Sequence, residues 1–240
     1  MQNSSEHIIR RLKDLARGYF FKIFNSYAKV WDFHALRAKT AMSAILTDVE
    51  DEATFDAKGE EFVERIRGYI KSDAVALDVG CGIGRVEKFL APLCREIYAV
   101  DVSSKMLKRA RKRLKDYANI HFIKNDGRSL GSLPDESIDF AFSVFVFQHI
   151  EKEDTICYLA DIYRVLKNNG GVYLQFPNIL HTQNCFFLLN YSLENRAYSP
   201  AKMRFYTPDE VKCIMEGIGF HVVSLDVTRH IFVYAQKAKV

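Results

Sequence analysis

Three glycines alternate with other residues directly after a short apolar segment of the chain. They are Gly80, Gly82 and Gly84, and the apolar segment before them is Ala74–Val79. Glycine lets the backbone turn sharply and lets a ligand approach the main chain closely. The apolar run is typical of a buried strand, and the pattern after the glycines is helical. A glycine-rich loop between a strand and a helix is the context of a nucleotide site, although it also occurs as a tight turn that binds nothing.

A carboxylate ends the next apolar run. Asp101 lies in the run Ile97–Val102, 21 positions after Gly80. An acidic residue about 20 positions after the glycine loop holds the ribose diol in dinucleotide-binding folds. A carboxylate can accept one hydrogen bond from each hydroxyl. We therefore expect Asp101 to bind a ribose, and the same side chain can also cap the helix that is predicted to begin at Ser104.

The glycine pattern departs from the dinucleotide fingerprint at one position. The fingerprint would place its third glycine or alanine at position 85, which is Arg85, whereas the third glycine comes early, at Gly84. This departure disfavours a nicotinamide-dependent dehydrogenase. With Asp78 two residues before the first glycine, the pattern Asp78-x-Gly80-x-Gly82-x-Gly84 resembles the first motif of class I S-adenosylmethionine-dependent methyltransferases.

The resemblance covers about residues 70 to 236. Later stretches that resemble the family are Asn125-Asp126-Gly127-Arg128, residues 138–150, residues 166–174, residues 204–210 and Gly219-Phe220. The resemblance implies S-adenosylmethionine as the cofactor, and it implies binding residues in the loops after the strands and in the N-terminal segment. These are Asp78, Gly80, Cys81, Gly82, Gly84, Asp101, Val102, Met106, Asp126, Gly127, Ser143, Val144 and Tyr27. In the family the acid at Asp126 takes the adenine amino group; the alternative is a turn residue, which the adjacent Gly127 favours.

The acceptor side is expected at the loop after the fourth strand, which lies beside the methyl group in this family. The resemblance and the side-chain chemistry suggest Phe145, Gln148, His149 and Arg204 as substrate-contacting residues. His149 is the candidate general base, because a histidine titrates near neutrality; the alternative is a histidine that only packs the loop. The loop lacks the Asn/Asp-Pro-Pro-Tyr/Phe signature, which argues against methylation of exocyclic nitrogens of bases.

Short apolar runs alternate with helical patterns from Ser72 onward, which predicts βαβ units and a parallel sheet. The predicted strands are Ala74–Val79, Ile97–Val102, Ile120–Ile123, Ile138–Val146, Gly171–Phe176, Phe220–Val227 and His230–Gln236. The predicted helices are Arg85–Pro92, Ser104–Tyr117, Asp154–Leu166 and Thr207–Gly217. Only Thr228 and Arg229 separate the last two strands, which is too short for a parallel crossover, so this pair is expected to be antiparallel.

The predicted fold is therefore α/β and doubly wound, with a seven-stranded, mostly parallel sheet and an antiparallel last strand. Residues 1–70 have helical periodicity and almost no strand-like runs, so we expect an N-terminal helical cap before a methyltransferase domain at 71–240. The segment Tyr27–Asp32 resembles the aromatic segment that folds over the cofactor, and residues 1 to about 45 are expected to close over the ligand. In the insert 178–205, the apolar run Phe186–Leu189 is expected to be core.

The composition excludes several other classes of protein. The chain is 48% hydrophobic with a net charge of +4, which gives no case for a dedicated nucleic-acid binder. Its five cysteines are scattered and odd in number, so neither a disulfide framework nor a metal site is expected. No run approaches the roughly 18 apolar residues of a membrane span, and a cytoplasmic location is expected by default. The basic stretch Lys105–Lys115 is expected to be a solvated helix rather than an RNA-binding face, and Ile8–Phe24 a lid helix rather than a membrane-surface helix.

Together these features predict an S-adenosylmethionine-dependent methyltransferase that acts on an oxygen or nitrogen of a small molecule. An RNA or protein methyltransferase and a non-catalytic S-adenosylmethionine-binding module remain the alternatives. The acceptor and the oligomeric state are left open by the sequence.

Overall fold

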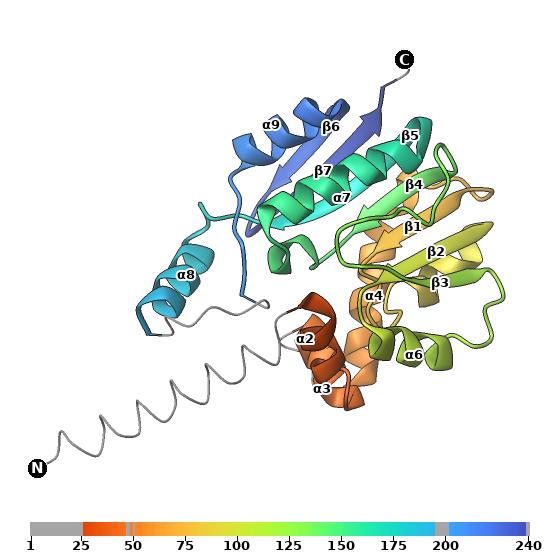
Figure 1. Cartoon of the computed structure of the whole chain (residues 1–240), viewed down its shortest axis with the longest axis horizontal. Coiled ribbons are helices and arrows are strands. Elements are labelled where there is room, and N and C mark those ends of the chain that lie inside the picture. The colour runs from red at the N-terminus through yellow and green to blue at the C-terminus, as the bar shows by residue number, and fades with distance from the viewer. Residues whose placement is uncertain (1–25, 47–48, 50, 195–201, 239–240) are drawn as a thin grey trace, which may run out of the picture.

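A twisted seven-stranded sheet forms the centre of the molecule (Figure 1). The computed structural model describes residues 26–46, 49, 51–194 and 202–238. The strands are β1 (Val75–Val79), β2 (Glu96–Asp101), β3 (Ile120–Lys124), β4 (Ile138–Ser143), β5 (Leu166–Pro177), β6 (Phe220–Val227) and β7 (His230–Lys237). Their order is β3-β2-β1-β4-β5-β7-β6; β7 pairs antiparallel with both β5 and β6, and all other neighbouring strands are parallel. The predicted seven-stranded sheet and its antiparallel last strand are thereby confirmed.

Helices cover both faces of this sheet, as a doubly wound fold requires. The helices are α2 (Tyr27–His34), α3 (Ala38–Ile45), α4 (Glu52–Ile66), α5 (Glu87–Leu90), α6 (Ser104–Arg113), α7 (Lys152–Val165), α8 (Thr182–Glu194) and α9 (Pro208–Ile218), with short 3-10 turns η1 (Arg67–Tyr69), η2 (Ala91–Leu93) and η3 (Phe147–His149). Apolar residues of α7 and α9 share one buried core with the strands, and those of α4, α5 and α6 share another. Every residue of β1 is buried, because both of its faces are covered. No helix in the described ranges is both long and apolar enough to cross a membrane.

Two strand boundaries differ from the sequence prediction by more than one residue. β4 ends at Ser143 rather than at Val146, because Phe145 adopts a left-handed backbone conformation with φ 61° that a strand cannot contain. β5 begins at Leu166, directly after α7, rather than at Gly171, and its pairing with β4 shifts register between Ile138 and Phe140. Apolar periodicity does not report such irregularities, because it reflects which residues alternate in polarity and not the backbone dihedral angles or the register of pairing.

The N-terminal helices occupy two different positions. Helices α2 and α3 lie over the edge of the sheet where the strands β1, β2 and β4 end (Figure 1). Helix α4 instead contributes Phe62, Val63 and Ile66 to the same core as the strands. The boundary at residue 70 stays a prediction, and the hydrophobic core is continuous across it. The part of the expected lid at residues 1–25, including Ile8–Phe24, lies outside the described residues.

The basic helix α6 holds the N-terminal helices in place. Its apolar residues Met106, Leu107 and Ala110 are buried, as the stripe in the sequence predicts. Arg109 Nε donates to the carbonyl of Ala35 (2.6 Å), which follows α2, and Arg113 forms ion pairs with the acidic side of α4. Part of the basic stretch Lys105–Lys115 therefore contacts other helices of the same molecule. Neither the predicted solvated helix nor the RNA-binding alternative included such contacts.

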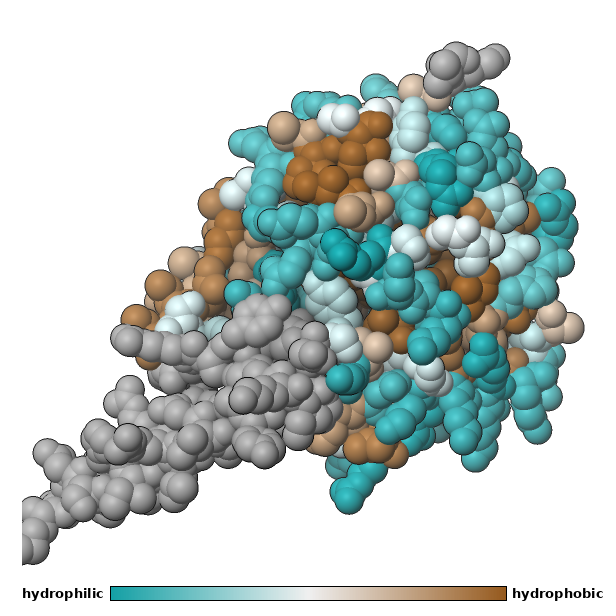
Figure 2. All heavy atoms as spheres, in the orientation of Figure 1, coloured by the Kyte–Doolittle hydropathy of each residue, from teal (hydrophilic) through white to brown (hydrophobic). Residues whose placement is uncertain are grey.

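The expectation that Phe186–Leu189 forms core is wrong. Phe186 is 60% exposed, Phe187 48% and Leu189 47%. Helix α8 leaves the end of β5 and stands off the body of the fold, and apolar side chains gather over it in the space-filling view (Figures 1 and 2). The buried amide of Asn184 donates to backbone carbonyls on one side of the helix, so α8 has only one packed side.

A close contact between α4 and the glycine turn yields a stability prediction. A Cβ atom at Gly59 would lie 2.4 Å from the backbone oxygen of Arg85, whereas one at Gly217 in α9 would meet nothing within 4 Å. We expect Gly59→Ala to destabilise the fold by about 1–3 kcal/mol through overpacking. The matched Gly217→Ala should stabilise it by up to about 1 kcal/mol through helix propensity. Urea unfolding of both variants decides this, and equal effects of the two substitutions would contradict the close contact.

Candidate functional site

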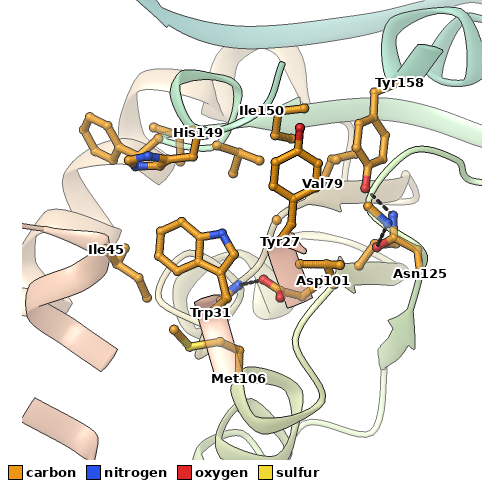
Figure 3. Close-up of a pocket in the computed structure, with 18 residues that line it drawn as sticks. Tyr27, Trp31, Ile45, Val79, Asp101, Met106, Asn125, His149, Ile150 and Tyr158 are labelled. Atoms are coloured by element: carbon orange, nitrogen blue, oxygen red, sulfur yellow. Dashed lines mark hydrogen bonds between the residues drawn. The ribbon is translucent and has the colours of Figure 1, made fainter. Parts of the chain in front are cut away.

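A pocket opens at the carboxyl ends of β1, β2 and β4, the edge at which doubly wound sheets bind ligands (Figure 3). Its wall comes from the N-terminal helices, the glycine turn and the loops after β2, β3 and β4. The lining residues are Tyr27, Trp31, Ile45, Val79, Gly80, Gly82, Val100, Asp101, Val102, Met106, Asn125, Gly127, Val144, Phe145, Val146, His149, Ile150 and Tyr158. Most of this wall is apolar or aromatic, with a few polar groups, which is the usual make-up of a small-molecule site.

The three glycines of the turn each lie against a different neighbouring side chain. All have positive φ, and a Cβ atom at Gly80 would lie 2.2 Å from Val146 Cγ2, on the opposite wall of the pocket. A Cβ at Gly82 would lie 2.8 Å from Ile45 in α3. A Cβ at Gly84 would instead meet Leu114, just beyond α6, at 2.4 Å. Gly80 and Gly82 therefore shape the pocket, whereas Gly84 allows a helix to approach the turn.

Asp101 lies at the centre of the polar contacts of the pocket. Its Oδ2 accepts a hydrogen bond from Gly82 N (2.9 Å) and its Oδ1 accepts one from Ser103 N (2.7 Å). Burial raises the pKa of Asp101 to about 6, against the lowering effect of these two backbone donors. A carboxylate has about four acceptor positions, so capacity remains for hydroxyl donors on a ligand. The cap of α6 is Ser103, whose hydroxyl accepts from Met106 N (3.0 Å).

A second group of buried charges lies beneath the glycine turn, outside the pocket lining. Asp78 and Glu87 are both buried, and burial together with their mutual repulsion raises the pKa of Asp78 well above its usual value. Arg85 lies close enough to favour their charged forms, and its Nη1 donates to the carbonyl of Lys58 (2.7 Å) in α4. Burial also raises the pKa of the Cys81 thiol well above its usual value, which keeps that thiol protonated.

The loop after β3 presents its backbone and an amide to the pocket. Asn125 and Gly127 line the wall, and Asn125 Nδ2 donates to the Tyr158 hydroxyl (2.5 Å) of α7. Asp126 is exposed, and its Oδ1 accepts from the backbone nitrogens of Arg128 and Ser129 (both 2.8 Å). These hydrogen bonds are those of a turn residue, which is the alternative that the sequence left open for Asp126. A contact between Asp126 and adenine stays a prediction.

Helix α2 inserts two aromatic side chains into the pocket. The rings of Tyr27 and Trp31 lie between His149 and Asp101 (Figure 3). The Tyr27 hydroxyl accepts from Glu151 N and donates to Asp154 Oδ2, both at 2.9 Å, and burial raises its pKa to about 12. The cap is thus anchored to the start of α7 at a point 124 residues further along the chain.

A third residue of α2, Asp32, fixes the other end of this helix. Its Oδ1 accepts from Ser103 Oγ (2.6 Å) and from Lys105 N (3.0 Å) at the start of α6. A carboxylate at the N-terminus of a helix also interacts favourably with the helix dipole. The sequence prediction gave Asp32 no role, although it stands in the aromatic segment that suggested the cap.

His149 closes the pocket on the side opposite the glycine turn. Its ring packs edge-on against Trp31, with ring centroids 5.1 Å apart, and its Nε2 lies 3.0 Å from Gln148 Nε2. Because an amide nitrogen only donates, this contact makes Nε2 the acceptor nitrogen of a neutral imidazole. To act as the predicted base, His149 would have to give up the hydrogen bond from Gln148 and accept one from the methyl acceptor instead.

Arg204 supports the loop that carries His149 rather than lining the pocket. Its guanidinium forms an ion pair with Glu151 and donates to the carbonyl of His149 (3.3 Å). Its backbone nitrogen donates to the carbonyl of Gln148 (2.7 Å). Ser143 has a similar supporting position, since its hydroxyl donates to the carbonyl of Val79 (2.7 Å) and ties β4 to the end of β1.

Ten of the residues predicted from the sequence therefore meet at one pocket. They are Tyr27, Gly80, Gly82, Asp101, Val102, Met106, Gly127, Val144, Phe145 and His149. Those that lie outside its lining are Asp78, Cys81, Gly84, Asp126, Ser143, Gln148 and Arg204. Their roles in binding stay predictions, and the structure gives most of them a local packing or hydrogen-bonding role. Lining residues that sequence reasoning missed are Ile45, Val79, Val100, Asn125, Val146, Ile150 and Tyr158.

Comparison with known proteins agrees with this geometry. Residues 77–174, which run from β1 to β5 and include most of the pocket, match the family model described as a methyltransferase domain. This part of the chain is therefore similar to a methyltransferase domain. Phosphoethanolamine N-methyltransferase 1 of Caenorhabditis elegans is 26% identical over 99 residues, covering 41% of this chain and 21% of that enzyme. The demethylmenaquinone methyltransferase of Tropheryma whipplei (strain Twist) is 33% identical over 94 residues, covering 39% of this chain and 38% of that enzyme.

Solved structures share the fold of the methyltransferase domain over most of the chain. Magnesium protoporphyrin IX methyltransferase from Synechocystis PCC 6803, solved with bound S-adenosylhomocysteine, has a TM-score of 0.65 at 17% identity and covers 87% of this chain and 98% of that one. A methyltransferase from Bacillus halodurans has a TM-score of 0.62 at 18% identity, with 77% and 99% covered. The chain spans less than two fifths of the length of the two curated relatives named above.

The residues of the pocket fit S-adenosylmethionine, the cofactor that the comparisons imply. The pocket combines a buried carboxylate at the end of β2 with a glycine turn. A Cβ atom added at Gly80 or Gly82 would fill space between this turn and the facing side chains. The Tyr27 ring lies 3.2 Å from the position that a Cβ atom of Gly127 would take, so a side chain at position 127 would crowd that ring. Within the described ranges, no cluster of three or more His, Cys, Asp and Glu side chains is arranged to hold a metal ion.

The raised pKa of Asp101 makes a pH dependence testable. The carboxylate is ionised above about pH 6 and neutral below it, and charge-assisted hydrogen bonds are roughly twice as strong as neutral ones. We expect the affinity for S-adenosylhomocysteine to fall as the pH is lowered through about 6. Asp101→Asn should weaken binding by roughly 10-fold at pH 7.5 and flatten this pH dependence. Calorimetry at several pH values measures both, and identical pH slopes in the two proteins would assign the effect to other buried acids such as Asp78 and Glu87.

Proposed function

We propose that this protein is an S-adenosylmethionine-dependent methyltransferase that acts on an oxygen or nitrogen of a small molecule. The observation that carries the proposal is the pocket itself. One wall is the glycine turn with Asp101, and the facing wall is the loop after β4 with His149. When bound, S-adenosylmethionine supplies an activated methyl group. The protein has to bind the cofactor and the acceptor, orient them toward each other and exclude water from the pocket. Aligning an acceptor can contribute roughly 7–11 kcal/mol to lowering the barrier.

The cap supports a small acceptor over a polymer. Tyr27 and Trp31 lie over the pocket from α2, and the hydrogen bonds of Tyr27 to Glu151 and Asp154 hold the cap to the acceptor-side loop. A covered pocket with aromatic walls suits a compact acceptor that enters beside the cap. Relatives named for phosphoethanolamine and demethylmenaquinone are consistent with this class of acceptor.

The cofactor is tested directly by binding. We expect saturable calorimetric binding of S-adenosylhomocysteine and none of NAD, because Arg85 stands where the dinucleotide fingerprint needs a small residue. Gly80→Val should abolish binding, since its side chain would occupy the space of Val146. Binding of NAD with none of S-adenosylhomocysteine would end the proposal. Binding without turnover on any of a panel of small alcohols and amines would favour a non-catalytic module.

The role of His149 is tested by turnover once an acceptor is found. We expect His149→Ala to lower kcat by roughly 10²–10⁴-fold while the affinity for S-adenosylhomocysteine changes little. His34 is the matched control, since its ring also contacts Trp31, at 5.7 Å, and His34→Ala should leave kcat nearly unchanged. Turnover against pH is measured for the wild type and both variants. An unchanged rate and pH profile in His149→Ala would leave His149 as a packing residue.

A further inference from the structure

The backbone of Phe145 has an unusual conformation at the wall of the pocket. Its φ is 61°, in the left-handed region that bulky side chains rarely adopt. Phe145 follows the end of β4 by two residues, and with Val144 and Val146 it forms one continuous part of the pocket lining. Such backbone strain persists only where neighbouring groups hold it in place.

A fully buried glutamine on β5 holds this conformation. Gln175 is 0% exposed, and its Oε1 accepts a hydrogen bond from Phe145 N (2.8 Å). Its Nε2 lies 2.6 Å from Nδ1 of His230, the first residue of β7. An amide nitrogen only donates, so His230 Nδ1 accepts and thereby fixes which end of the amide faces Phe145. Neither Gln175 nor His230 lines the pocket.

The surroundings of His230 keep it able to accept this bond. Burial, together with the neighbouring Arg229 and His181, lowers the pKa of His230 to about 4. The imidazole is therefore neutral at ordinary pH. Its ring also packs edge-on against the Phe145 ring, with centroids 5.5 Å apart. The pair Gln175–His230 thus contacts both the backbone and the side chain of Phe145.

The bend at Phe145 determines how closely Val146 approaches the glycine turn. Val146 Cγ2 lies 2.2 Å from where a Cβ of Gly80 would stand, so the two walls of the pocket are in contact there. A strand that continued through Phe145 would carry Val146 along another path. The side-chain amide of Gln175 holds the backbone nitrogen of Phe145, and the next residue is Val146. This hydrogen bond therefore affects the distance between the two walls.

We propose that Gln175 and His230 are positioning residues, which hold the left-handed bend at Phe145 and so place Val146 against Gly80. They control the shape of the cofactor pocket and the start of the acceptor loop without touching either ligand. The part that concerns ligands rests on the proposed methyltransferase function. The part that concerns the bend can be measured on the protein alone.

The first test replaces the amide by a side chain of similar length that makes no hydrogen bonds. We expect Gln175→Met to speed amide hydrogen exchange at Phe145 by roughly 3- to 10-fold in the absence of ligand, because its acceptor is lost. Affinity for S-adenosylhomocysteine should fall by roughly 10-fold or more, since small displacements in a site are costly. The control is Gln236→Met on β7, whose amide donates to Tyr234 OH (3.0 Å), and it should change neither measurement. If Gln175→Met does not fold, His230→Phe, which keeps a ring against Phe145, carries the same test.

The second test is a rescue with a spectroscopic signature. Gln175→Glu keeps an acceptor for Phe145 N, but its other oxygen can bind His230 Nδ1 only when that nitrogen carries a proton. We expect NMR titration to show the His230 pKa rising from about 4 to above its ordinary value of about 6.5. Because the carboxylate still accepts from Phe145 N, and the Nδ1–H tautomer of neutral His230 can still donate to it, protection of the Phe145 amide should be retained on both sides of the new pKa.

Two results would overturn the proposal. They are unchanged Phe145 exchange in both Gln175→Met and His230→Phe, and a His230 pKa that stays near 4 in Gln175→Glu. If exchange and the His230 pKa behave as expected but the wild type does not bind S-adenosylhomocysteine, the positioning role stands and the proposed function fails.

Discussion

The carboxylate of Asp101 accepts hydrogen bonds from two loops whose donor residues, Gly82 and Ser103, lie 21 positions apart in the chain. Gly82 N reaches it from the glycine turn after β1, and Ser103 N reaches it from the turn into α6. Ser103 in turn donates to Asp32 of α2. The glycine turn, the second strand and the N-terminal cap are therefore joined through one buried acid. Burying a carboxylate is costly unless donors satisfy it, so the loops around Asp101 are held in the positions that supply those donors.

The two sides of the pocket are held in different ways. The glycine turn and Asp101 are joined by hydrogen bonds from backbone nitrogens. The other side depends on side chains that meet from distant elements, as Tyr27 meets Glu151 and Arg204 meets the loop of His149. Each of these bonds can be exchanged for another at small net cost. Ligand entry is therefore expected to use the side formed by α2 and the loop after β4.

Local sequence patterns predicted the parts of the site that are local in the chain. The strand–glycine–helix unit and Asp101 lie within about 30 residues, and alternating apolar runs are sufficient to place them on adjacent parallel strands. The antiparallel β6–β7 pair followed from a two-residue connection. What the sequence could not predict are contacts between residues far apart. Asp32 with Ser103 and Asn125 with Tyr158 depend on how helices pack, and no periodicity encodes that. In helix α8 the sequence predicted packing that the structure does not have: the apolar run Phe186–Leu189 was expected to be buried and is largely exposed.

The order of strands in the sheet also has a consequence for how the chain can fold as it is made. β7 lies between β5 and β6, and both of its neighbours precede it in the sequence. During translation β6 leaves the ribosome before the strand that connects it to the rest of the sheet, and β5 still has one edge without hydrogen bonds. An unpaired edge strand is a template for pairing with other chains. Before β7 is complete, the free edge of β5 and both edges of β6 can therefore pair with other chains, and β7 then covers the edge of β5 and one edge of β6.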